Sequence, residues 1–108
     1  MKISTKGQIL LFKDNEIVRF EAKGNDTIIY STDGSSSEID VPLDSIAKQL
    51  KNYAFIRVQQ NHLINVNFIT GIPDKTSNFI EVNNSQLLPI SKEQKEIIIQ
   101  LISSHLKN

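Results

Sequence analysis

The chain has 108 residues, of which 39% are hydrophobic and 22% are charged, which is ordinary for a single globular domain. It has no cysteine, so disulfides, thiolate nucleophiles and cysteine-ligated zinc are excluded. Twelve basic residues balance twelve acidic ones, so any nucleic-acid-binding surface must gather its positive charge locally.

The first part of the chain predicts short strands joined by polar turns. The apolar and β-branched runs that indicate strands are residues 7–13, 16–22, 27–32 and 38–41. Period-two alternation in the second run predicts one shared face made of Val18, Phe20 and Ala22. Gly24 and Asn25 both tolerate a positive φ and predict a turn at 23–26, and Asp33-Gly34 predicts another.

A change of period then predicts a short helix. Leu43, Ile46, Ala47 and Leu50 fall at i, i+3, i+4 and i+7, and Pro42 suits the entrance of a helix. Strands are predicted at 55–59, 79–82 and 86–90, with residues 83–85 as a hairpin turn. Residues 61–69 fit neither period, so an irregular, well-packed segment is expected there.

A final helix is predicted to open at Ser91, where Gln94 completes a capping-box pattern, and to run to about Leu106. Its expected inward stripe consists of Ile97, Ile98, Leu101 and Ile102. The whole pattern predicts a mainly β (α+β) fold of antiparallel strands with one short helix and one C-terminal helix. No linker or repeat divides residues 1–108, so we expect a single domain.

The sequence gives no sign of an enzyme, a metal site or a cofactor. The two histidines, at positions 62 and 105, have no metal-ligand spacing, and four glycines cannot build a phosphate-binding loop. The acidic residues fall mostly in turns and at helix starts, where carboxylates have structural roles. The apolar runs at 9–12 and 97–102 are too short for a signal peptide or a membrane span. We therefore expect a cytoplasmic protein without membrane insertion.

The sequence FIRVQQNHLINVNFI at residues 55–69 resembles the signature of the LytTR DNA-binding domain family. The positions that match directly are Phe55, Arg57, Val58, Asn65 and Ile69. Residues 21–25 and 88–92 resemble two further blocks of the family, in the same order and spacing. The resemblance covers roughly residues 10 to 105.

The resemblance implies an elongated, mostly β fold that acts as a transcriptional regulator related to two-component response regulators. In this family three loops on one edge enter two successive major grooves and the groove between them. Transferred by position, these loops are residues 23–27, 59–61 and 91–92. The implied partner is double-stranded DNA with tandem sites, bound by two copies of the domain.

The residue types in these loops suit DNA. Amides can pair with adenine, short polar groups can meet bases or phosphates, and cations can hold phosphates. The candidate contacts are Lys23, Asn25, Thr27, Arg57, Gln59, Gln60, Asn61, Ser91 and Lys92. Three of them also have a structural interpretation: Asn25 as a turn residue, Arg57 as a salt-bridge partner within the sheet and Ser91 as a helix cap. Asn65 is assigned to structure and His62 to packing.

The chain departs from the family at three positions. Gln59 stands where the family usually has histidine, Asn61 where it has serine, and Lys92 where it has arginine. Lysine lacks the planar fork of arginine, so bidentate reading of guanine would be lost at position 92. Phosphate contacts by three or four cations would give a salt slope of about −3 to −4. The alternative is a module that binds another regulatory protein and has weakened or lost DNA binding. No receiver domain is expected within the chain.

Overall fold

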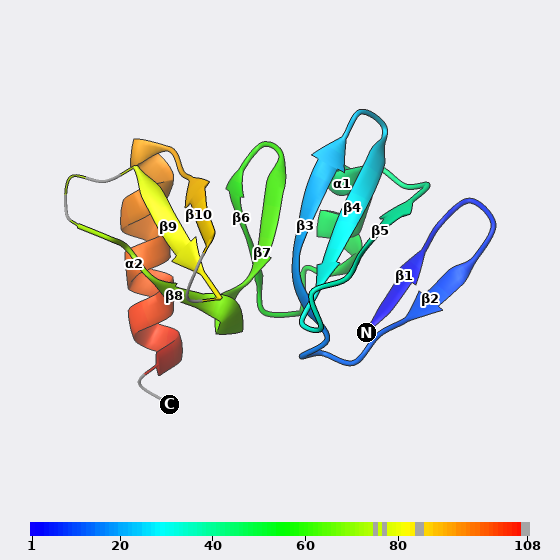
Figure 1. The fold of residues 1–108 in the computed structure, drawn as a ribbon, viewed down its shortest axis with the longest axis horizontal. Helices are drawn as coiled ribbons and strands as arrows, with labels where there is room; N and C mark the ends of the chain where they lie inside the picture. The colour runs from blue at the N-terminus through cyan, green and yellow to red at the C-terminus, as the bar shows by residue number, and fades with distance from the viewer. Residues whose placement is uncertain (75, 77, 84–85, 107–108) are drawn as a thin grey trace.

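The computed structural model describes residues 1–74, 76, 78–83 and 86–106, and antiparallel β-strands dominate this part of the chain (Figure 1). The molecule is elongated, with extents of 43 × 30 × 25 Å. The described residues form ten strands, two α-helices and one short 3-10 helix. This architecture confirms the predicted mainly β fold class.

A five-stranded sheet in the order β5-β4-β3-β7-β6 forms the middle of the molecule. Its strands are β3 (Ile17–Lys23), β4 (Asp26–Ser31), β5 (Ser36–Ile39), β6 (Phe55–Gln59) and β7 (His62–Asn65). A two-stranded sheet consists of β1 (Lys2–Ser4) and β2 (Ile9–Leu11). A three-stranded sheet consists of β8 (Ile69–Gly71), β9 (Phe79–Val82) and β10 (Gln86–Pro89).

Two hydrophobic clusters hold these elements together, and the five-stranded sheet contributes to both. The first cluster packs helix α1 (Leu43–Gln49) against the sheet through Phe20, Ile46 and Leu63. The second joins the sheet to the three-stranded sheet and to helix α2 (Lys92–Leu106) through Ile64, Ile80 and Ile98, among others. Phe20, Ile46, Ile64, Ile80 and Ile98 are all fully buried, so neither helix position depends on surface contacts alone.

Strand β3 differs from the predicted period-two pattern. Its register with β4 shifts between Ile17 and Arg19, which marks a bulge. Val18 consequently belongs to the second cluster, whereas Phe20 and Ala22 both contribute to the first, so the predicted common face is confirmed for Phe20 and Ala22 and wrong for Val18. A bulge inserts one residue into the strand and reverses the alternation beyond it. Strand β5 also begins two residues earlier than expected, because Ser36 and Ser37 pair with β4.

The segment 61–69 is more regular than expected. It contains strand β7, the 3-10 helix η1 (Val66–Phe68) and the first residue of β8. Asn65 is buried, and its Nδ2 donates to the Ile17 carbonyl at 3.0 Å. Its Oδ1 accepts the Asn67 backbone N–H at 3.0 Å, which caps η1. The structural role predicted for Asn65 is confirmed.

Helix α2 has the predicted bounds but a different inward face. Ile98 is buried and Ile102 packs against the second cluster, as expected. Ile97 and Leu101 are 50% and 46% exposed, so the prediction for these two residues is wrong. Lys95 lies three residues before Ile98 and is buried instead.

The predicted hairpin turn at 83–85 lies partly outside the described residues, since 84 and 85 are not among them. Neither helix in the described part of the chain has the length and apolarity that a membrane span requires.

Candidate nucleic-acid interface

Three segments that are far apart in the sequence lie along one edge of the molecule (Figure 1). They are the turn from β3 to β4, the turn from β6 to β7 and the start of α2, and we call this edge the rim. The backbone N–H of Ala22, near the end of β3, donates to the Asn61 carbonyl at 2.9 Å. A hollow of about 520 Å³ joins the second turn to α2. The three loops named from the sequence therefore form one continuous surface.

The β3–β4 turn is a two-residue hairpin. Lys23 pairs with Asp26, and Gly24 has a φ of +61°, the arrangement of a type II′ turn with glycine first. Asn25 is exposed at the tip. Thr27 is fully buried, and its hydroxyl donates to the Val41 carbonyl at 2.7 Å. Thr27 therefore cannot reach DNA, and its inclusion among the contacts is corrected: the alternation of β4 turns this side chain inward.

Carboxylates surround the cation of this first turn. Lys23 Nζ lies 2.9 Å from Glu38 Oε1 on β5. Hydrogen bonding and charge raise the pKa of Lys23 and lower that of Glu38. The pKa of Asp26 is raised, chiefly because its carboxyl group loses solvent and secondly because it forms a hydrogen bond with Glu38. Both partners of the Lys23 pair are largely exposed, so water and salt screen the interaction.

The conformation of the β6–β7 turn is held by Arg57, a side chain of strand β6. Arg57 Nε donates to the Gln60 carbonyl at 3.1 Å, and Nη2 donates to the same oxygen. Arg57 Nη1 also pairs with Asp44 Oδ1 at 2.5 Å. The sequence offered an ion pair within the sheet as the structural interpretation of Arg57. An ion pair is present, but its partner, Asp44, lies on α1 and not on a neighbouring strand. Each of the three guanidinium nitrogens of Arg57 thus donates a hydrogen bond within the fold.

The surface of this turn is neutral and rich in amides. Gln60 and Asn61 are exposed, and Gln59 is half-buried. Gln94, on the first turn of α2, lines the same hollow together with Ser91 and was not among the predicted residues. The capping-box pattern was the signal that could have found it, because the third helical residue lies beside the cap.

The start of α2 supplies the third part of the rim. Ser91 Oγ accepts the Gln94 backbone N–H at 3.1 Å, which confirms Ser91 as a helix cap. Lys92 is exposed, and within the described part of the chain no carboxylate pairs with it. It stands at the positive end of the α2 dipole. Of the three predicted cations, Lys92 is therefore the best placed for an anion.

The family sequence model of the LytTr DNA-binding domain matches residues 7–103 of the chain. The chain belongs to the LytTR family. Its structure is also similar to the LytTr DNA-binding domain of a protein described as a methyl-accepting/DNA response regulator from Bacillus cereus. The two share 19% sequence identity with a TM-score of 0.70 over 94% of each chain, so this likeness shows the fold. No curated protein matches the sequence.

Beneath the rim of this LytTR domain lies a charged group that sequence reasoning missed. Arg19 is 3% exposed, and its guanidinium lies 3.7 Å from the centre of the Tyr30 ring. Its Nη1 is 2.9 Å from Glu21 Oε1, and its Nε donates to Gln86 Oε1 at 3.2 Å. Arg19 thus links the five-stranded sheet to β10, and its burial excludes it from DNA contact.

His62 follows the β6–β7 turn and is packed, as predicted, with a side chain that is 13% exposed. Its Nδ1 is buried and has no hydrogen-bond partner among the described residues. Glu21 Oε1 lies 3.6 Å away, too far for a hydrogen bond. Burial lowers the pKa of His62, Glu21 opposes that shift, and Arg19 adds to it.

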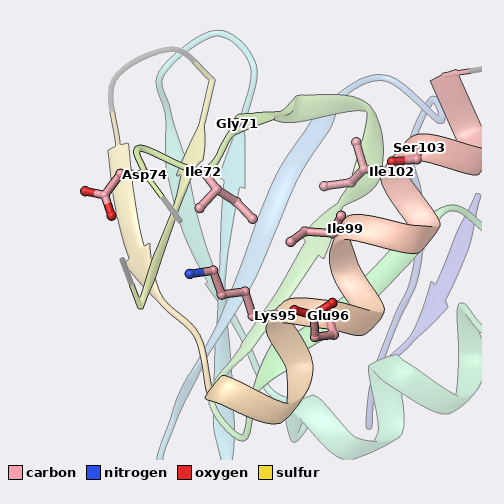
Figure 2. Close-up of a pocket in the computed structure, with 8 residues that line it drawn as sticks. All are labelled: Gly71, Ile72, Asp74, Lys95, Glu96, Ile99, Ile102 and Ser103. Atoms are coloured by element: carbon pink, nitrogen blue, oxygen red, sulfur yellow. The ribbon is translucent and has the colours of Figure 1, made fainter. Parts of the chain in front are cut away.

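Away from the rim, a second hollow of about 550 Å³ lies between α2 and the chain that follows β8 (Figure 2). Ile72, Ile99 and Ile102 give it an apolar lining, whereas Asp74 points away from it. The described residues contain no cluster of three side chains able to hold a metal ion. The side chain of His105 lies outside the described part of the structure.

Proposed function

We propose that this LytTR domain is a cytoplasmic transcriptional regulator that binds double-stranded DNA by inserting the three rim segments into successive grooves. The observation that carries the proposal is the alignment of these three segments along one edge (Figure 1). Family membership supports DNA as the partner. The rim residues proposed to face DNA are Lys23, Asn25, Gln59, Gln60, Asn61, Ser91 and Lys92.

The charges on the rim indicate weak binding by one copy of the domain. Lys92 is available for a phosphate, whereas Lys23 must first leave Glu38 and Arg57 is held by Asp44. One or two phosphate contacts give a salt slope of roughly −1 to −2, shallower than the sequence alone suggests. Two copies on tandem sites would gain affinity through effective concentration. We therefore propose that the functional complex contains two domains on one duplex.

Fluorescence anisotropy with a mixed duplex library at two salt concentrations tests this proposal. Lys92→Ala should weaken binding and make the salt slope shallower by about 0.9, the effect of one lost phosphate contact. Lys51→Ala is the matched control, because this exposed lysine precedes β6 at the end opposite to the turn. Binding that is absent, or equally sensitive to both substitutions, would falsify the proposal.

A second candidate function is a module that binds another regulatory protein. The observation that favours it is an exposed apolar pair on α2: Ile97 and Leu101 lie one turn apart on the same face and are 50% and 46% exposed. Exposed apolar residues that adjoin one another are typical of protein-interaction sites. Failure to bind any duplex in the anisotropy experiment would make this the preferred function.

A further inference from the structure

The β1–β2 hairpin exposes an apolar sheet face at one end of the molecule. Lys2 pairs with Leu11 and Ser4 pairs with Ile9, and residues paired across two antiparallel strands lie on the same face. Ile9 and Leu11 are 64% and 77% exposed. Ile3 lies on the other face of the hairpin and is buried in the first cluster. The exposed face therefore points away from the core, and we call these four exposed residues the hairpin face.

Helix α2 carries an apolar stripe at the opposite end of the molecule (Figure 1). Ile97 and Leu101 lie one turn apart and are 50% and 46% exposed. Glu93 is also exposed and lies one turn before Ile97 on the same side of the helix. We call Glu93, Ile97 and Leu101 the helix stripe. The molecule is 43 Å long, so the helix stripe cannot meet the hairpin face of its own chain.

The hairpin face and the helix stripe match in spacing and in charge. Ile9 and Leu11 are two residues apart in a strand, which is about 6.8 Å along its axis. Ile97 and Leu101 are four residues apart in a helix, which is about 6 Å along its axis. A lysine borders the apolar pair on the hairpin, and a glutamate borders the apolar pair on the helix. Packing of a helix stripe on an open sheet face is a common way to bury both.

We propose that the hairpin face of one copy of this chain binds the helix stripe of a second copy in a head-to-tail contact. Each apolar pair covers the other, and Lys2 lies near Glu93 across the contact. If two hairpin faces or two helix stripes paired with each other, two Lys2 or two Glu93 side chains would share one interface, where like charges repel. Because the two faces differ, each copy keeps one free face, and the contact can repeat along a row of copies.

The small area of the two faces indicates a weak contact. Stable protein interfaces bury about 1,200–2,000 Å². Four apolar side chains that the fold already covers in part supply much less. The contact therefore becomes populated where two copies are held close together, as tandem sites would hold them in the proposed complex. The contact itself needs no DNA, so it can be tested without a duplex and independently of the proposed function.

Amide NMR spectra over a dilution series that starts in the millimolar range test the inference, because they detect weak association and locate it. In the wild type, the signals of β1–β2 and of α2 should shift together with concentration and give the same Kd. Leu11→Glu and Ile97→Glu should each abolish these shifts. Leu87→Glu is the matched control, because Leu87 is 52% exposed and belongs to neither face, so its shifts should match those of the wild type.

A mixture of the two blocked variants shows which faces meet. Isotope-labelled Leu11→Glu protein keeps its helix stripe, and unlabelled Ile97→Glu protein keeps its hairpin face. Mixing them should restore the shifts in α2 of the labelled protein and leave its β1–β2 signals unchanged. Shifts that persist in one variant alone would show that like faces pair, which overturns the head-to-tail contact.

Charge reversal tests the ionic part of the contact. Lys2→Glu should weaken the association about 1.5- to 5-fold, the range of an exposed ion pair. Adding Glu93→Lys should restore the affinity, because the reversed pair again has opposite charges. Failure to restore it overturns the pairing of Lys2 with Glu93. A wild type without concentration-dependent shifts, or with shifts confined to other parts of the chain, overturns the whole inference.

Discussion

The two hairpin turns of the rim obtain their shapes in different ways. The β3–β4 turn depends on its backbone, since Gly24 adopts a left-handed φ of +61° at the tip. The β6–β7 turn has no positive φ at Gln60 or Asn61 and depends on side-chain and backbone hydrogen bonds from Arg57 and Ala22. The first turn is therefore fixed by local sequence and the second by packing between elements.

The cations of the two turns differ in how firmly the fold holds them. Lys23 is paired with Glu38 at the surface, where both side chains are largely exposed, so it can exchange the carboxylate for a phosphate. Arg57 makes three donations to two partners, and its side chain is only 32% exposed. The first turn therefore offers adjustable charge, whereas the second offers a fixed set of amides suited to reading bases.

The largest effect is expected from Gly24→Ala. A left-handed conformation costs an L-residue about 1–2 kcal/mol, so the free energy of unfolding should fall by about that amount. A Cβ at position 24 would meet no atom within 4 Å, so the penalty comes from the backbone alone. Urea denaturation measures it. Gly7→Ala is the control, because Gly7 has equally open space without a positive φ. Equal losses in the two variants would contradict a backbone-determined turn.

The charge of the first turn is tested by Glu38→Gln. Removing the carboxylate releases Lys23, so DNA affinity should rise severalfold at low salt and the salt slope should steepen by about 0.9. The same substitution in a Lys23→Gln background should have a much smaller effect, which isolates the pair from the general loss of negative charge. Similar gains in both backgrounds would show that Lys23 does not contact phosphate.

The local features of this domain could be predicted from sequence. The Gly24 turn, the bounds of β6 and the Ser91 cap each depend on a few adjacent residues, and each was predicted. The three rim segments were found because the family blocks kept their order and spacing. The resemblance also implied that these segments share one edge, and the structure shows them along one edge (Figure 1).

The features that depend on packing could not be predicted. Arg57 and Asp44 are thirteen residues apart on a strand and a helix, so no periodicity links them. Thr27 has a sequence position suited to DNA contact, but the Val41 carbonyl across from β4 accepts its hydroxyl. In α2, five apolar residues crowd positions 97–102, so the pattern could not tell which of them face inward.

The smallest effect on stability is expected from the protonation of His62, which follows the β6–β7 turn. Burial lowers the pKa of His62 below its unfolded value of about 6.5, so the unfolded chain binds more protons near that pH. The contribution of His62 to the free energy of unfolding should therefore be fully present above about pH 6.5. It should be lost as the pH falls from this value toward the lower pKa of the folded state. Glu21 favours the protonated form and so opposes this lowering of the pKa, whereas Arg19 adds to it. His62→Gln should flatten the melting temperature between pH 7 and about pH 5.5, above the range in which most carboxylates titrate. If the wild type and the variant lose stability in parallel, another group titrates there and the β6–β7 turn is indifferent to pH. If only the wild type responds, His62 is the titrating group.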